Sequence, residues 1–196
     1  SLLPLCLGLL TIPSVTFAET SSESRTRSNY IKIVDQRPPL TTADKMRIRA
    51  MADKVEKTEP PAPLEDTFTL HSNPGASKVL YLDFDGHSIM WQGAPFDYVP
   101  FNMEGSDSNF SDMERTVIQL AWQSVSEDFL PFDLDVTTEY PGQDALMNTG
   151  GSDTEWGIRA VVSHNDGSAS WAYVGSFSDS EDTELYAFAG NYLDDM

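Results

Sequence analysis

Two aspartates, Asp83 and Asp85, stand one residue apart at the end of the apolar run 79–82 and are followed by Gly86. An ionised aspartate at the end of a strand can attack a phosphoryl group, while its neighbour handles the proton of the leaving group and Mg²⁺ neutralises the phosphate. The same pair can instead end the strand through an Asp-Gly turn. The spacing therefore predicts either a phosphoryl-transfer site or a strand cap.

This strand and its Asp-x-Asp-Gly ending are similar to the first motif of the haloacid-dehalogenase-like phosphohydrolases. That resemblance implies attack on phosphorus by Asp83 with help from Asp85, and Ser163, at the end of a later predicted strand, would supply the second-motif hydroxyl. Two departures weigh against it. His87 replaces the expected threonine, and no lysine that could hold the phosphate follows Lys78. The strand-cap interpretation is therefore favoured.

The histidines are the next candidates, because imidazole is a common zinc ligand. His71, His87 and His164 are the three in the chain, and no two of them lie four residues apart on a predicted helix. The motif His-Glu-x-x-His is absent. All three are expected in loops beside turns, where we interpret them as turn-stabilising residues rather than metal ligands.

Charge divides the chain into two unequal parts. Residues 1–78 hold ten Lys and Arg and nine Asp and Glu, a net charge of +1, whereas residues 79–196 hold two and twenty-two, a net charge of −20. A surface this acidic repels phosphate backbones, which excludes nucleic acid as a partner. Carboxylate-rich loops such as 179–182 offer hard oxygen ligands, so calcium is a candidate cofactor, although no EF-hand spacing exists and no ligands are assigned.

The elements that must position these residues begin with a β-prone strand over 78–84. Ser111 and Glu114 form a capping box, so a helix is expected from there to near Pro131, with a wide apolar stripe. Between them, 87–101 is expected to be a loop that carries four aromatic residues. Further strands are predicted over 132–138, 157–163, 170–177 and 185–189. This order indicates the α/β class, with a mixed sheet and a long packed helix.

The first 66 residues form two segments ahead of these elements. Residues 1–18 combine an apolar core with a small-residue exit before Glu19, which is typical of a signal peptide, here incomplete at its N-terminus. A spanning helix needs about 20 apolar residues, so we expect no stable membrane insertion after signal removal. Residues 19–66 are interpreted as a polar leader or propeptide with a helix over 42–57 and a Pro-rich linker. Cys6, the only cysteine, lies in the signal.

Residues 67–196 resemble the N-terminal part of the catalytic domain of bacterial secreted reprolysin-like zinc metallopeptidases, which are zincins of the metzincin type. The resemblance lies in a set of phrases rather than in a catalytic motif. The phrases are Leu-His-Ser-Asn-Pro-Gly-Ala-Ser-Lys-Val-Leu-Tyr-Leu-Asp-Phe-Asp-Gly-His (70–87), the helix with Trp122 and Glu-Asp-Phe (127–129), Pro-Phe-Asp-Leu-Asp-Val-Thr-Thr-Glu (131–139), Gly-Ile-Arg (157–159) and Ala-Tyr-Val-Gly-Ser-Phe (172–177).

The resemblance implies a zincin-like twisted mixed sheet, truncated before the active-site helix, and an edge strand that receives the substrate. That edge would be 170–177, with Trp171, Tyr173 and Gly175 on the side that meets a peptide; the two aromatic side chains face either that ligand or the core. The zinc ligands and catalytic glutamate would lie beyond residue 196, so this chain by itself is expected to be inactive. We expect a secreted protein, periplasmic in transit, that acts on proteins or peptides. A secreted acidic binding or adhesion module, calcium-dependent or not, is the alternative.

Overall fold

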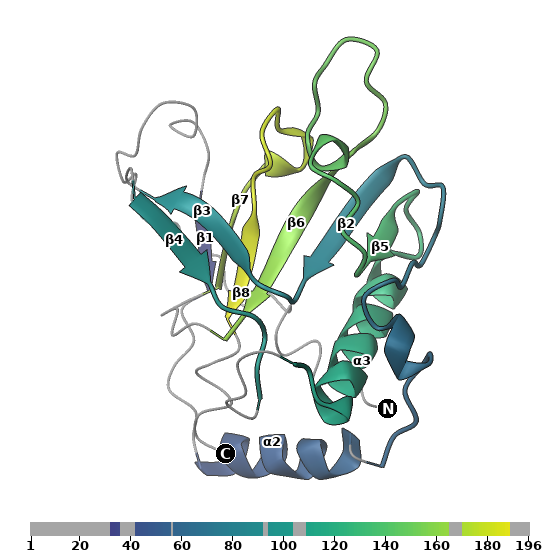
Figure 1. The fold of residues 1–196 in the computed structure, drawn as a ribbon, viewed down its shortest axis with the longest axis vertical. Helices are drawn as coiled ribbons and strands as arrows, with labels where there is room; N and C mark the ends of the chain where they lie inside the picture. The colour runs from purple at the N-terminus through teal and green to yellow at the C-terminus, as the bar shows by residue number, and fades with distance from the viewer. Residues whose placement is uncertain are drawn as a thin grey trace.

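The structure, a computed structural model, describes residues 32–35, 42–55, 57–91, 94–103, 109–164 and 170–188. The predicted signal peptide, 1–18, lies outside these ranges. The described residues form a sheet with the helix α3 (Asp112–Phe129) on one face and a separate hairpin on the other, and the helix α2 (Thr42–Val55) lies below the sheet in Figure 1. The predicted α/β class with a mixed sheet and a long packed helix is therefore confirmed.

The main sheet runs in the order β1-β7-β8-β6-β2-β5. Its strands are β1 (Lys32–Asp35), β2 (Lys78–Asp83), β5 (Asp135–Thr137), β6 (Trp156–Ser163), β7 (Ser170–Tyr173) and β8 (Leu185–Phe188). The neighbours β5, β2, β6 and β8 are parallel, whereas β7 is antiparallel to β8 and β1 is antiparallel to β7. The pairing of neighbouring strands thus changes from parallel to antiparallel between β8 and β7.

The central strands are the apolar runs of the sequence. Alternation along β2 points Leu80 and Leu82 into the core under α3, and it points Tyr81 and Asp83 to the opposite face. The strands predicted over 78–84, 157–163 and 185–189 are confirmed within one residue at each described end. The strand predicted over 132–138 is shorter, because Phe132 finishes a turn after α3 by donating its amide to the Phe129 carbonyl.

The helix α3 begins where the capping box predicts. Ser111 Oγ accepts the Glu114 amide at 3.3 Å, and Glu114 Oε2 accepts the Ser111 amide at 2.8 Å. Its apolar stripe packs against β2, β5 and β6, with Ile118 fully buried. Because β2 and β5 are parallel neighbours, α3 is the crossover that joins them.

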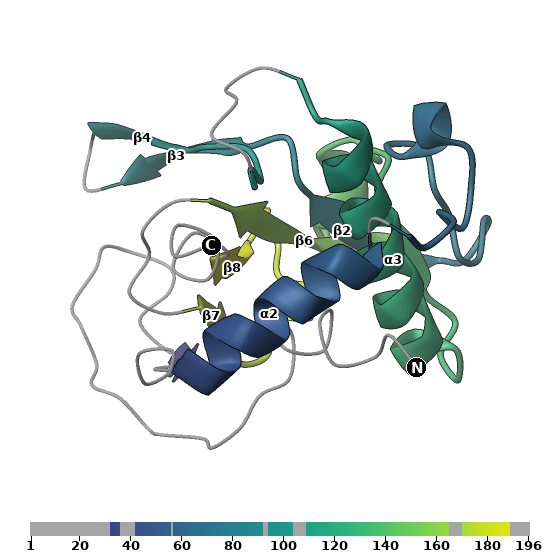
Figure 2. The same cartoon turned by 90° about the horizontal axis from the view of Figure 1, so that it is seen from below.

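The predicted loop over 87–101 is wrong in its first part. Residues there form a hairpin of β3 (His87–Trp91) and β4 (Ala94–Tyr98), which Figure 2 shows set apart from the main sheet. Tyr98 anchors it, because its ring lies 4.4 Å from that of Tyr186 on the face away from α3. Gly86, with φ +96°, makes the turn into β3, where a side chain would meet the Tyr98 carbonyl.

Residues 19–66, interpreted above as a leader and linker, contribute three described elements, which are β1, α2 and the short 3-10 helix η1 (Leu64–Asp66). The helix predicted over 42–57 is present as α2, which ends earlier than predicted, at Val55, and this Val55 is buried in the main core. The strand β1 has no counterpart in the prediction, which treats 19–66 as polar leader and linker. The chain is fixed to α3 slightly ahead of residue 67, because Gln119 bonds the Ala62 amide and the Pro63 carbonyl. No helix in the described ranges is long and apolar enough to cross a membrane.

Candidate functional site

The strand β7 is the candidate peptide-binding edge. Its side chains are half-buried, and the Trp171 ring lies 4.4 Å from Tyr186 and 5.2 Å, edge to face, from Tyr173. Trp171 and Tyr173 therefore share one face of the strand, the face that carries the hairpin and lies away from α3. Trp171 packs against the smaller core there.

Gly175 does not belong to this strand, so the strand predicted over 170–177 is wrong at its end. The strand stops at Tyr173, Gly175 adopts φ +87°, and a short 3-10 helix, η3 (Ser176–Ser178), follows. Ser176 Oγ donates to the Tyr173 carbonyl at 3.0 Å and closes the turn. A left-handed glycine turns the chain out of the sheet, so Gly175 lies beyond the edge that Trp171 and Tyr173 form.

The backbone of β7 has two sides, and both are paired. One side pairs with β8 through Trp171 and Tyr186. The other side pairs with β1 in a register that sets Lys32 opposite Tyr173 and Asp35 opposite Ser170. The side turned to β1 thus accepts an extended segment of four residues in antiparallel orientation. The run Tyr-Ile-Lys-Ile-Val over 30–34, rich in β-branched and aromatic residues, is the sequence signal that could have revealed β1.

A second polar cluster lies where β2 ends. Asp83 is 1% exposed, and its Oδ2 accepts the Arg159 Nη1 hydrogen at 2.6 Å. Arg159 also donates through Nε and Nη2 to Asp182 Oδ2, at 3.2 and 3.0 Å. The guanidinium lies 5.3 and 5.2 Å from the ring centroids of Tyr81 and Tyr140. A lone arginine inside the buried run 157–163 is the signal that could have predicted such acidic partners.

Burial sets the electrostatics of Asp83. Desolvation and the neighbouring Asp85 carboxyl raise the pKa of Asp83 to about 7, and the Arg159 guanidinium offsets only part of that rise. Asp83 Oδ1 is buried and has no hydrogen-bond partner. Asp85 is exposed. The two aspartates of the motif therefore occupy different surroundings, and Asp83 is held by an arginine rather than presented to solvent.

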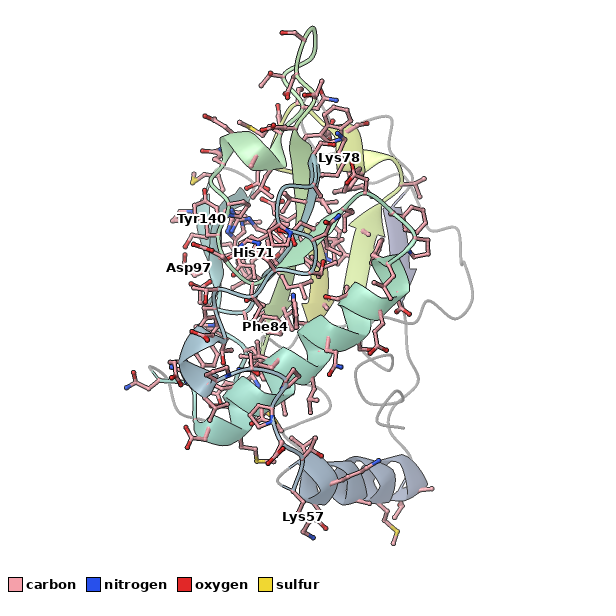
Figure 3. The ribbon with its side chains drawn as sticks, turned by 90° about the vertical axis from the view of Figure 1, so that its right-hand side faces the viewer. Lys57, His71, Lys78, Phe84, Asp97 and Tyr140 are labelled. Carbon is pink, nitrogen blue, oxygen red and sulfur yellow. The ribbon has the colours of Figure 1, made fainter. Side chains whose placement is uncertain are left out.

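His71 and Asp135 join the start of the domain to β5. His71 Nδ1 lies 2.6 Å from Asp135 Oδ2, and Nε2 lies 2.9 Å from Glu139 Oε2, on the side of the sheet shown in Figure 3. Asp135 Oδ1 accepts the amides of Ser72 and Asn73. Burial lowers the pKa of His71, but the hydrogen bonds and charges of the two carboxylates outweigh it, so the pKa is raised. His71 is thus part of a turn that is fixed to β5.

The other two histidines lie apart from His71. His87 Nε2 is 3.2 Å from Glu184 Oε1, and His87 Nδ1 is 3.9 Å from Asp83 Oδ2. His164 Nδ1 is 2.6 Å from the Asn102 carbonyl. The histidines do not converge on one point.

The described residues contain no set of side chains that could bind the zinc or calcium ions considered in the sequence analysis. Among those residues, no group of three or more His, Cys, Asp or Glu side chains is arranged to hold a metal ion. In the acidic loop 179–182, Asp182 accepts from Arg159, and Asp179 Oδ2 accepts the Thr183 hydroxyl at 2.7 Å. The described residues therefore do not fit zinc, and calcium stays a prediction.

Comparisons of the chain with protein-family models, with curated proteins and with solved structures found no match.

Proposed function

We propose that residues 67–196 form the N-terminal part of the catalytic domain of a secreted zinc-dependent endopeptidase, and that β7 is the edge that holds its substrate. The substrate class is a protein or peptide in extended conformation. The alternative is a secreted acidic module that binds an extended peptide at the same edge and does not cleave it.

The order and direction of the strands support this proposal. The resemblance leads us to expect a sheet with a long helix packed on it, followed by an edge strand and one last strand. In the structure α3 packs on the sheet, β7 and β5 are the two edge strands that residues 67–188 contribute, and β8 comes last in the chain while lying inside β7. This zincin-like arrangement is part of the proposal.

The observation that carries the proposal is the pairing of β7 with an extended segment. Main-chain hydrogen bonds of this kind bind a peptide with little regard to its sequence, while alternate side chains add specificity. Four consecutive residues of β1 already pair there in antiparallel register. Such an edge suits a peptidase, because it straightens the substrate and fixes its register before any bond is cut.

The hydrolytic step would depend on a zinc ion and a glutamate outside the described residues. A protein-bound zinc ion supplies an activated water molecule for attack on a peptide carbonyl. The part of the chain described here contributes substrate positioning: backbone pairing from β7, and an aromatic face from Trp171 and Tyr173.

The reading frame that follows residue 196 provides the test. We expect His-Glu-x-x-His within about the next 30 codons, and a protein that includes it should cleave a denatured protein and lose that activity to a zinc chelator. The 196-residue chain should show no zinc-dependent cleavage, and it is the matched control. A downstream frame without the motif would reject the peptidase and leave the peptide-binding module.

A further inference from the structure

We propose that the leader strand Lys32–Asp35 is an internal occupant of the peptide-binding edge, and that an outside peptide can pair with β7 only after this strand has left. The inference rests on the proposed function for the role of that edge. It concerns regulation of the same site, since the chain that supplies the edge also supplies the segment that covers it.

The geometry makes the two occupants mutually exclusive. A strand has two hydrogen-bonding sides, and β7 pairs on one of them with β8, which continues into the parallel part of the sheet. The other side pairs with β1 from Lys32 opposite Tyr173 to Asp35 opposite Ser170. An incoming peptide would need the same amides and carbonyls of β7, so the leader and the peptide compete directly.

The leader strand β1 is paired with the rest of the sheet on one side. It is one of the two edge strands of the sheet, with β5 at the other edge, and its only partner among the described strands is β7. The central strands, in contrast, have neighbours on both sides and side chains in the core. Removing β1 therefore exposes one row of backbone groups and leaves the order β7-β8-β6-β2-β5 intact.

The connection between leader and domain has an accessible segment. Lys57, just past α2 in Figure 3, is exposed, as are Glu59 and Pro61. The next fixed point is Ala62, whose amide donates to Gln119 at 2.9 Å. A proteolytic cut after Lys57 would break the covalent link between the domain and both β1 and α2 without breaking any strand pair of residues 67–188, and departure of α2 would then withdraw Val55 from the main core.

The net charges of α2 and of residues 79–196 are opposite in sign. Helix α2 contains four basic and two acidic residues, whereas residues 79–196 carry a net charge of −20. Opposite net charges attract at long range, and salt screens that attraction. Once the covalent link is cut, the leader should dissociate more readily as ionic strength rises.

The covalent link between the leader strand and the domain determines how strongly the leader weakens the binding of an added peptide. A segment joined by a short flexible link acts at an effective concentration of about 1 mM. If the free leader peptide binds β7 with a Kd of about 100 µM, occupancy in the intact chain weakens the binding of an added peptide about tenfold.

The experiment uses the complete 196-residue chain and a fluorescent peptide with the sequence of residues 30–37 as probe. The variant Ile33→Pro/Val34→Pro removes two adjacent leader amides, one of which faces β7 because amides alternate along a strand. The variant Ile33→Ala/Val34→Ala keeps both amides and is the matched control. We expect the proline variant to bind the probe about tenfold more tightly than wild type, with the alanine variant close to wild type.

Hydrogen exchange of the β7 amides provides the second measurement. They should exchange slowly in wild type, faster in the proline variant, and slowly again when the probe is added to that variant. Equal probe affinity in wild type and the proline variant would overturn the proposal. The proposal would also be overturned if the proline variant keeps the circular dichroism spectrum of wild type and exchanges its β7 amides fast, but does not bind the probe.

These measurements separate the two proposals, because neither of them requires cleavage. A proline variant that binds the probe supports leader occupancy even when the longer reading frame carries no peptidase activity. Conversely, a zinc-dependent peptidase whose β7 does not exchange its leader for the probe would retain the enzyme assignment and lose this mode of regulation.

Discussion

Replacing Asp83 by asparagine should abolish the pH response of this buried position. In the wild-type protein Arg159 Nη1 donates a hydrogen bond to Asp83 Oδ2, with 2.6 Å between the two atoms. Asparagine retains a carbonyl oxygen that can accept this bond, but its side chain cannot ionise. Two effects compete in the wild-type protein. Burial of a side chain that is 1% exposed favours the protonated acid, and the guanidinium favours the carboxylate. Burial prevails at this site, since the pKa of Asp83 is raised.

The sign and size of the effect follow from linkage. The pKa of the Asp83 carboxyl is about 7 in the folded protein and 3.8 in the unfolded chain. The folded state therefore binds more protons between these pH values. The stabilisation of the folded state that comes from protonated Asp83 is fully present below about pH 4, and it is lost as pH rises through 7. A difference of about 3 pH units corresponds to about 4 kcal/mol, at about 1.4 kcal/mol for each unit.

The assay is urea unfolding followed by tryptophan fluorescence at pH 4 to 8, for wild type and Asp83→Asn. The free energy of unfolding of wild type, minus that of the variant, should fall by up to about 4 kcal/mol across this range. Asp128→Asn, on the exposed side of α3, is the matched control and should show a constant difference. The comparison should be repeated with His87→Gln, because His87 Nδ1 lies 3.9 Å from Asp83.

The opposite slope would refute the reasoning. If wild type gains stability relative to Asp83→Asn as pH rises from 4 to 8, the ion pair with Arg159 dominates and Asp83 is a carboxylate throughout. A flat difference would likewise show that burial does not control this group.

Three further changes test the packing and the turn at β5. Ser111→Ala removes the hydroxyl that caps α3 and should lower the free energy of unfolding by about 1 kcal/mol in urea titrations, because one helix-end amide loses its acceptor. Gly157→Ala should lower it by about 1–3 kcal/mol, since a β-carbon there would overlap the Val79 carbonyl in the β2–β6 pair, and a melting temperature equal to wild type would contradict this contact. Asp135→Asn should lower the pKa of His71 in an NMR titration. It should also reduce the stabilisation by protonated His71, which is present below pH 6.5 and lost as pH rises through the raised pKa, whereas an unchanged titration would contradict the pairing.

The sequence predicted the elements whose signals are local. The capping box of Ser111 and Glu114 and the periodic apolar stripe fix α3, and the apolar runs fix β2 and β6. These residues determine their own conformation through short-range hydrogen bonds and through one continuous buried face. The α/β class followed from the order of these elements.

The errors fell where a distant segment decides the conformation. The β3–β4 hairpin contains Pro95 and exposed residues, and it is fixed by the stacking of Tyr98 on Tyr186. Gly175 looked like a strand residue, but its positive φ turns the chain into η3. For the candidate site, Trp171 and Tyr173 lie on the predicted strand, whereas its backbone partner in the leader was not predicted.

By itself the sequence determined the helices α2 and α3 and the strands β2, β6 and β8, how charge is divided between residues 1–78 and 79–196, and that Asp83 ends a strand. Only the tertiary structure decided that β1 covers β7 and that Arg159 joins Asp83 to Asp182. The physical reason differs between the two cases. Side-chain patterns record which face of an element is buried, but every residue offers nearly the same backbone groups, so the choice of strand partner depends on the complete fold.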